Sequence, residues 1–151
     1  MKTQTILRLV VVGLVLTCLT PSDISSRPRA QFDPDGAFWI IGTAPTDFSD
    51  FGSINLNSKH LRRLPAAGLQ LNNGRTFRYK SLSVKRENFT FTTVVVNGVG
   101  YSFTGHFLKD GVFSSLELDD KTPVLEGRLV KYKAGKKVAE ANLNFSYFGG
   151  T

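Results

Sequence analysis

The sequence is poor in the side chains that carry most covalent and metal chemistry. Its 151 residues include one cysteine and two histidines. The cysteine, Cys18, lies in the apolar segment near the N-terminus, so a chain that has lost this segment has no disulfide, no thiolate metal ligand and no cysteine nucleophile. Folded stability must then come from burial of apolar side chains in a single core.

Catalytic motifs are also missing. The chain has no Gly-x-Ser-x-Gly elbow, no His-Glu-x-x-His pair and no glycine-rich phosphate loop. Residues 33–36 match the first positions of a calcium loop, but its later oxygen ligands are absent, so they predict a turn. We therefore expect no metal, no cofactor and no catalytic residue. An enzyme with an unrecognised site is kept as an alternative, and it requires His60 or His106 to lie in a cavity near a carboxylate.

Long apolar runs are absent as well. The longest near the N-terminus, residues 9–19, is shorter than the roughly 20 residues of a transmembrane helix. Two basic residues precede it and a polar, proline-containing stretch follows, which is the layout of a secretory signal peptide over residues 1–22. Cleavage is expected after Ser22, with Ser26 as the second choice. Lipidation of Cys18 is not favoured, because the usual small residue does not precede it. We expect a secreted or periplasmic protein.

Acidic residues are outnumbered, since 12 Asp and Glu stand against 19 Lys and Arg. Most of this excess lies outside the expected signal peptide, so we attribute it to the folded domain. The basic residues form three clusters. These are Lys59, Arg62 and Arg63; Arg75, Arg78, Lys80, Lys85 and Arg86; and Lys131, Lys133, Lys136 and Lys137.

Two interpretations of the basic clusters remain open. Lysines on exposed strands discourage edge-to-edge pairing, which makes a solvated surface the simpler reading. The functional reading is attraction to a polyanion, which outside the cytoplasm means lipid headgroups, an acidic polysaccharide or an acidic protein. Export argues against nucleic acid as a partner. The candidate polyanion site consists of Lys131, Lys133, Lys136 and Lys137.

The clearest fold signal lies in residues 88–108, where Asn97-Gly98 separates two runs of β-branched and aromatic residues. Asn-Gly supplies the positive φ angles of a type I′ turn, so this segment predicts a hairpin. Short links around it predict an antiparallel meander. The other expected strands cover residues 37–42, 52–58, 68–71, 75–85, 112–118, 124–132 and 138–148.

We therefore expect an all-β domain over residues 37–148, with eight or nine strands closed as a small barrel or folded as a sandwich. An extended, loosely ordered lead-in over residues 23–36 precedes it. A barrel in an outer membrane is the structural alternative, although the polar stretch over residues 43–65 fits it poorly.

Finer features follow from the side-chain pattern. Phe48 and Phe51 should hold the loop over residues 43–51 against the core, and residues 58–65 predict one helical turn that covers a barrel end. Apolar residues switch from odd to even positions near Lys80-Ser81, which predicts a bulge or bend.

Alternation about Asn97-Gly98 predicts which side chains share a face. The core face should hold Val94, Val96, Val99, Tyr101, Phe103 and Phe107. The opposite face should hold Phe89, Phe91 and Val95 with Ser102, Thr104 and His106. Because this second face mixes apolar and polar residues, we expect a loop, a second sheet or a ligand to cover part of it. Phe89, Phe91 and His106 are therefore the candidate ligand-binding residues.

Three functions fit these features. The first is a non-catalytic binding module for a lipid or other apolar ligand inside the barrel, or for an anionic polymer or membrane surface. The second is a structural or protein-interaction component of the cell envelope or extracellular space, and the third is the enzyme named above. Asn88 and Asn144 each begin a glycosylation sequon, which matters only in a host that glycosylates.

Overall fold

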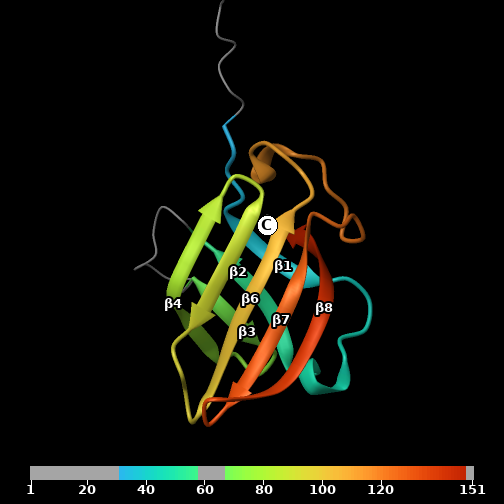
Figure 1. Ribbon diagram of the computed structural model, residues 1–151. Helices are drawn as coiled ribbons and strands as arrows, with labels where there is room; N and C mark the ends of the chain where they lie inside the picture. The colour runs from blue at the N-terminus through green and yellow to red at the C-terminus, as the bar shows by residue number, and fades with distance from the viewer. Residues whose placement is uncertain (1–30, 58–66, 149–151) are drawn as a thin grey trace, which may run out of the picture.

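The computed structural model describes residues 31–57 and 67–148, which form a closed antiparallel barrel (Figure 1). Each strand pairs with the next strand along the chain, and β8 pairs with β1 to close the barrel. The strands are β1 (Gly36–Ile40), β2 (Phe51–Leu56), β3 (Gly68–Leu71), β4 (Thr76–Lys85), β5 (Asn88–Thr93), β6 (Val99–Phe107), β7 (Leu125–Lys133) and β8 (Lys136–Phe148). The expected all-β meander is confirmed, and it is a barrel with eight strands.

Turn chemistry explains the tight links between the strands. Asn97 and Gly98 adopt φ angles of 52° and 76°, as the predicted type I′ turn between β5 and β6 requires. Ala134 and Gly135 adopt nearly the same angles between β7 and β8. The amide of Ala134 donates to the carbonyl oxygen of Gly98 at 2.7 Å, so the two hairpins support each other at one end of the barrel.

The predicted irregularity in β4 is confirmed. Tyr79 pairs with Thr93 and Ser81 pairs with Thr92, which leaves Lys80 as the extra residue of a bulge. Because of the extra residue, odd-numbered side chains of β4 face the core before the bulge and even-numbered ones face it after the bulge. Leu82 and Val84 therefore pack against the same core as Phe77. The switch from odd to even apolar positions is therefore the sequence signature of this bulge.

The face assignment of the central hairpin is wrong for three residues. Phe91 pairs with Phe103, whereas Val96 pairs with Val99, so the register shifts by one residue between these two pairs. The shift turns Phe89 and Phe91 into the core, and it leaves Val94 39% exposed. The prediction assumed that side chains alternate without interruption from the turn to the far end of each strand. The register shift close to the turn breaks this alternation, so the residues of β5 face the opposite side from the one predicted.

Aromatic side chains fill the barrel interior. Phe91 and Phe103 stack with centroids 5.5 Å apart, and Phe89 and Phe107 stack at 5.4 Å. Phe145 approaches Phe103 edge-on from β8 at 5.7 Å. Buried aromatic side chains come from strands all around the barrel, so one continuous core holds the wall together.

Tyr101 is buried in this core, and the partly buried ring of Tyr79 packs against it. Burial raises the pKa of Tyr101 to about 12, and nearby Asp50 raises it further whereas Arg75 lowers it. Burial also raises the pKa of Tyr79, whose hydroxyl donates to the carbonyl oxygen of Asn55 at 2.9 Å. Both side chains therefore favour the protonated form in the folded protein more strongly than in the unfolded chain.

We expect Tyr101 to make folding sensitive to alkaline pH. Below about pH 10 the Tyr101 hydroxyl keeps its proton in both the folded and the unfolded state, so Tyr101 makes its full contribution to stability. Between about pH 10 and pH 12 the unfolded chain loses this proton first, and the free energy of unfolding falls. Urea unfolding from pH 8 to 12 should show a steeper loss in the wild type than in Tyr101→Phe, by on the order of 1–2 kcal/mol. Equal slopes in the two proteins would contradict this prediction.

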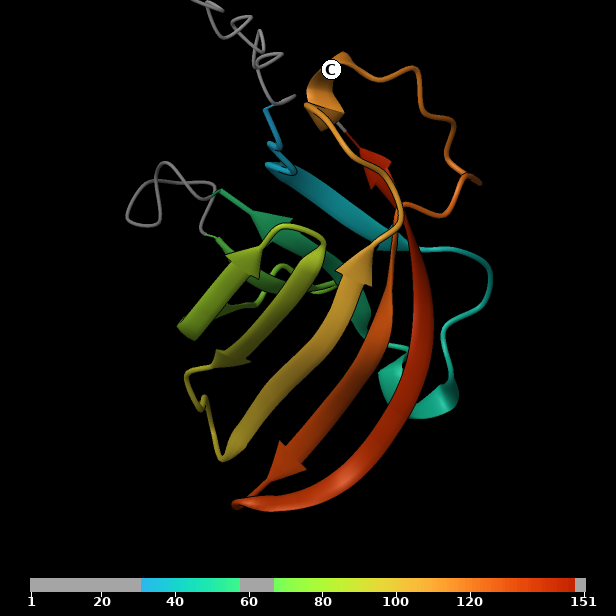
Figure 2. The same cartoon turned by 45° about the horizontal axis from the view of Figure 1, so that its top comes forward.

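Residues 31–35 of the lead-in and a short helical turn cover one end of the barrel, as Figure 1 and Figure 2 show. Asp33 bridges to Val112, and Phe113 lies fully buried at the start of the 3-10 turn η2 (Phe113–Ser115). The half-buried ring of Phe32 contacts Phe107 and Phe113. Two expectations are corrected here: residues 112–118 are not a strand, because Phe113 turns into the barrel end, and the last part of the lead-in is packed against the barrel.

At the opposite end, a loop is fixed as predicted. It contains the 3-10 turn η1 (Thr46–Phe48), and Phe48 and Phe51 are both buried. Lys131 holds this loop from β7, since its Nζ donates to the carbonyl oxygen of Asp47 at 3.1 Å and lies 3.6 Å from Oδ1 of Asp50.

The helical turn expected over residues 58–65 lies outside the described residues. Within residues 31–57 and 67–148, no helix is long and apolar enough to cross a membrane.

Candidate functional site

The outward side chains of β4 to β8 form a regular polar surface. Because successive residues of a strand point to opposite sides, the core-facing aromatic residues alternate with these polar ones. The strand registers align them in rows across the sheet. The first row is Lys85, Asn88, His106, Glu126 and Asn144, and the second is Ser83, Thr90, Thr104, Arg128 and Asn142.

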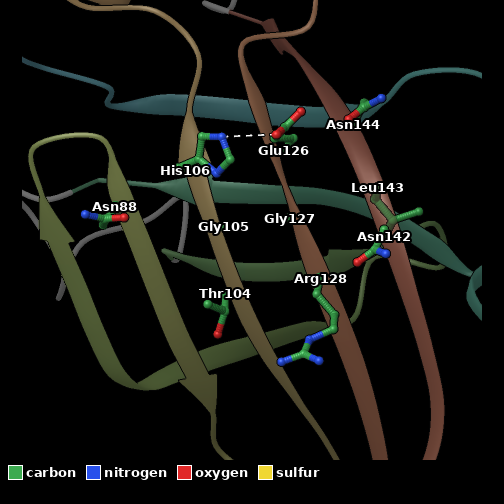
Figure 3. A pocket seen from close by; sticks show the side chains of 10 residues that line it. All are labelled: Asn88, Thr104, Gly105, His106, Glu126, Gly127, Arg128, Asn142, Leu143 and Asn144. Carbon is green, nitrogen blue, oxygen red and sulfur yellow. Dashed lines mark ion pairs between the residues drawn. The ribbon is translucent and has the colours of Figure 1, made fainter.

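A hollow of about 500 Å³ lies over these two rows on the outside of the barrel (Figure 3). We call it the outer hollow. Its polar walls are the side chains of Asn88, Thr104, His106, Glu126, Arg128, Asn142 and Asn144. They come from β5, β6, β7 and β8, so the position of each is set by the paired strands and not by a loop.

Two paired glycines form the floor of the outer hollow. Gly105 of β6 lies opposite Gly127 of β7, and the Phe103 ring packs beneath both. A Cβ at Gly105 would overlap the carbonyl oxygen of Glu126, and a Cβ at Gly127 would lie 2.5 Å from the Phe103 ring. Glycine is therefore required for Phe103 to fill the core at this point, and the outer side of the pair is bare backbone.

One contact between an imidazole and a carboxylate lies within the outer hollow. Nε2 of His106 and Oε1 of Glu126 are 3.0 Å apart, and both side chains remain nearly half exposed (Figure 3). Asn144 follows Glu126 in the same row. Solvent weakens an ion pair at such exposure, so its main effect is to orient the imidazole.

The remaining polar groups give the outer hollow a mixed character. Arg128 carries a positive charge on the β7 side, and Glu126 on the same strand carries a negative one. The amides of Asn142 and Asn144 both donate and accept hydrogen bonds. The outer hollow thus offers donors and acceptors in similar supply with nearly balanced charge. Nowhere in the described chain do three or more His, Cys, Asp or Glu side chains form a metal site.

The structure does not bring the candidate ligand-binding residues together. Phe89 and Phe91 are buried in the barrel core, whereas His106 lies on the outer surface. A ligand on the outside of the wall can reach His106 but neither phenylalanine. The predicted placement of these three residues on one face is therefore wrong, although His106 does line the outer hollow.

The candidate polyanion site is only partly available. Lys131 is held by Asp50 and by the backbone of Asp47, and it lies over the Tyr101 ring. Lys137 pairs with Glu140 at 3.2 Å. Lys133 and Lys136 face each other across the hairpin and are exposed, and neither has an ion pair in the described part of the chain.

Charge in the described barrel is close to balanced. Of the 19 Lys and Arg residues 12 lie in the described ranges, as do 11 of the 12 Asp and Glu residues. The excess positive charge therefore comes mainly from segments outside these ranges. This weakens the argument that the barrel wall itself attracts polyanions.

Sequence reasoning did not single out most of the outer hollow. Asn142 and Asn144 are polar residues of the strand expected over residues 138–148, and Glu126 and Arg128 lie in the strand expected over residues 124–132. Alternation of side chains along a strand predicts which of its residues point outward. It does not predict which polar residues of separate strands become neighbours, because this depends on register.

Comparison with known proteins identifies no relative. No protein-family model, no curated protein and no solved structure matches this chain. No residue role can therefore be transferred from another protein, and function must be inferred from the outer hollow and the surface around it.

Proposed function

We propose that the protein is an exported, non-catalytic binding module that binds a hydroxyl-rich glycan in the outer hollow. One observation carries this proposal: seven polar side chains from four strands surround a floor of bare glycine backbone. Such a floor leaves room for a flat ring to approach the sheet, while the walls can reach its substituents.

The chemistry of the walls suits sugar hydroxyls. Each hydroxyl both donates and accepts hydrogen bonds, and it is matched by groups of both kinds. Asn88, Asn142 and Asn144 provide amides, Thr104 provides a hydroxyl and Glu126 provides acceptor oxygens. Because these side chains stand on paired strands, little backbone ordering is needed on binding.

The other binding hypotheses have less support. Stacked phenylalanines occupy the interior that an apolar ligand would need, including Phe89 and Phe91. A polyanion on the β7–β8 hairpin would rely mainly on Lys133 and Lys136, since Lys131 and Lys137 already have partners. A structural or protein-interaction role in the envelope or extracellular space remains the alternative if no glycan binds.

The contact between His106 and Glu126 favours one second candidate, a hydrolase that acts in the same hollow. A carboxylate beside an imidazole can hold the ring in place for proton transfer. Release of reducing sugar from a bound glycan, lost in His106→Ala, would support the hydrolase over the non-catalytic module.

The proposal is tested with the purified protein on a panel of immobilised neutral and acidic glycans. The double variant Asn142→Ala/Asn144→Ala should bind at least about tenfold more weakly, because it removes two hydrogen-bonding groups from the wall. The matched control is Val138→Ala/Glu140→Ala, which changes two exposed residues of the same strand outside the outer hollow. Absence of binding to every glycan, or equal binding by both double variants, would refute the proposal.

A further inference from the structure

We propose that Trp39 is a stacking platform for a second sugar ring of the glycan bound in the outer hollow. This inference rests on the proposed function and extends it to a ligand of at least two rings. Trp39 is the only tryptophan of the chain. It lies on the outward side of β1 and is 50% exposed, whereas its neighbour Phe38 is completely buried.

Trp39 belongs to an aromatic patch. The ring of Phe148, itself 48% exposed, lies 5.9 Å from the indole at an angle of 62°. Single exposed apolar residues are common on protein surfaces, but two large aromatic side chains in contact leave a continuous apolar area in water. That area is available for a ligand with an apolar face.

The patch is continuous with the outer hollow through β8. Trp39 pairs with Ser146, which is the next outward residue of β8 after Asn144. Adjacent outward positions on a strand are about 7 Å apart. This step is close to the spacing of neighbouring rings in a glycan, so one ligand can contact Asn144 and Trp39 together.

A second hollow adjoins the outer hollow on the side of β1. It has a volume of about 290 Å³, shares Asn142 and Asn144 with the outer hollow, and reaches Ile40 and Ile41, which follow Trp39 in the chain. The amide of Ile41 donates to the carbonyl oxygen of Asn144 at 2.9 Å, which fixes the end of β1 against β8. The binding surface therefore extends across β8 toward β1.

The surroundings of Trp39 favour a sugar over a protein partner. Ser53 and Ser146 flank the indole in its row, and both are small and buried. Asn55 and Gln70 lie nearby and are joined by a hydrogen bond of 3.2 Å. A stable protein interface needs roughly 800 Å² on each partner, much more than two side chains provide. An aromatic face bordered by polar groups instead suits the C–H face and hydroxyls of one sugar ring.

The experiment uses the single tryptophan as its own probe. The purified full chain is titrated with oligosaccharides of one to four rings, chosen from the best-binding glycan of the panel. In the wild type, tryptophan emission should change with saturation. Affinities are measured for every protein by isothermal titration calorimetry, because the two Trp39 variants have no tryptophan, and the wild-type affinity should rise about three- to tenfold once a second ring is present. Trp39→Ala should lose this gain with length, Trp39→Phe should keep part of it, and Val138→Ala should keep all of it.

Two negative outcomes are distinguishable. If glycans bind through Asn142 and Asn144 but Trp39→Ala and Trp39→Phe show the same length dependence as the wild type, the role of Trp39 is refuted and the proposed function stands. If no glycan binds the wild type, the proposed function fails and this inference fails with it.

Discussion

Replacing Phe103 by alanine should lower the free energy of unfolding by about 3–5 kcal/mol, which is the largest effect that we expect of a single substitution. Phe103 is 1% exposed and contacts Phe89, Phe91 and Phe145. Its ring also packs beneath the glycine pair that forms the floor of the outer hollow. Alanine would leave a cavity that the surrounding rings cannot refill, because strand pairing fixes their backbone positions.

Urea unfolding followed by circular dichroism measures this loss. Phe103→Leu, which keeps most of the volume, should lose less and serves if the alanine variant does not fold. The control is Val95→Ala, since Val95 belongs to the same hairpin but is 67% exposed, and it should change stability by less than about 0.5 kcal/mol. A loss below about 1 kcal/mol in Phe103→Ala would contradict a filled barrel interior.

Gly105→Ala should destabilise the barrel by about 2–3 kcal/mol. The cause is overpacking, since the new methyl group has no room, whereas Phe103→Ala leaves an empty space. The new methyl group would overlap the carbonyl oxygen of Glu126 and lie 2.6 Å from the Phe103 ring. The backbone oxygen cannot move without breaking the pairing of β6 with β7. Since Glu126 also borders the outer hollow, we expect weaker glycan binding in the same variant.

Gly100→Ala is the matched control for this substitution, because both glycines lie in β6. A methyl group at Gly100 would meet the exposed side chain of Val95 at 3.3 Å, and that side chain can move aside. Thermal unfolding should therefore show a much larger decrease in Tm for Gly105→Ala than for Gly100→Ala. Equal decreases would show that the glycine pair is not sterically required.

Much of the barrel follows from local signals in the sequence. The Asn97-Gly98 turn and the switch of apolar positions at Lys80 each predict a feature that the structure confirms. Both depend on residues close together in the chain. The features that local reasoning missed are the register shift after Thr93 and the turn that buries Phe113, and both depend on contacts with other strands or with the lead-in.

Less of the candidate site than of the fold can be predicted from the sequence. Polar alternation predicts that Arg128 and Asn142 point outward, but only the register of β7 with β8 makes them neighbours. Likewise, nothing local shows that Gly105 lies opposite Gly127. His106 is a candidate because alternation about Asn97-Gly98 places it on the mixed second face, and it is the only one of the three candidate ligand-binding residues that borders the outer hollow.

The distribution of charge illustrates the same limit. A net charge of +7 describes the whole chain, and it suggested an electrostatic partner for the domain. In the described barrel, Lys131 and Lys137 are engaged by acidic groups of the protein itself. Composition therefore overstated the positive charge that the barrel surface presents to a ligand.

The central claim is that ligand binds on the outer wall of the barrel, and residue-resolved NMR tests it most directly. The ¹⁵N-labelled protein is titrated with the glycan that binds best in the panel. We predict that the largest chemical-shift changes occur at Thr104, Gly105, Glu126, Asn142 and Asn144, together with the indole N–H of Trp39. Changes confined to the core around Phe89 and Phe91, or to the hairpin between Lys133 and Lys136, would contradict the claim.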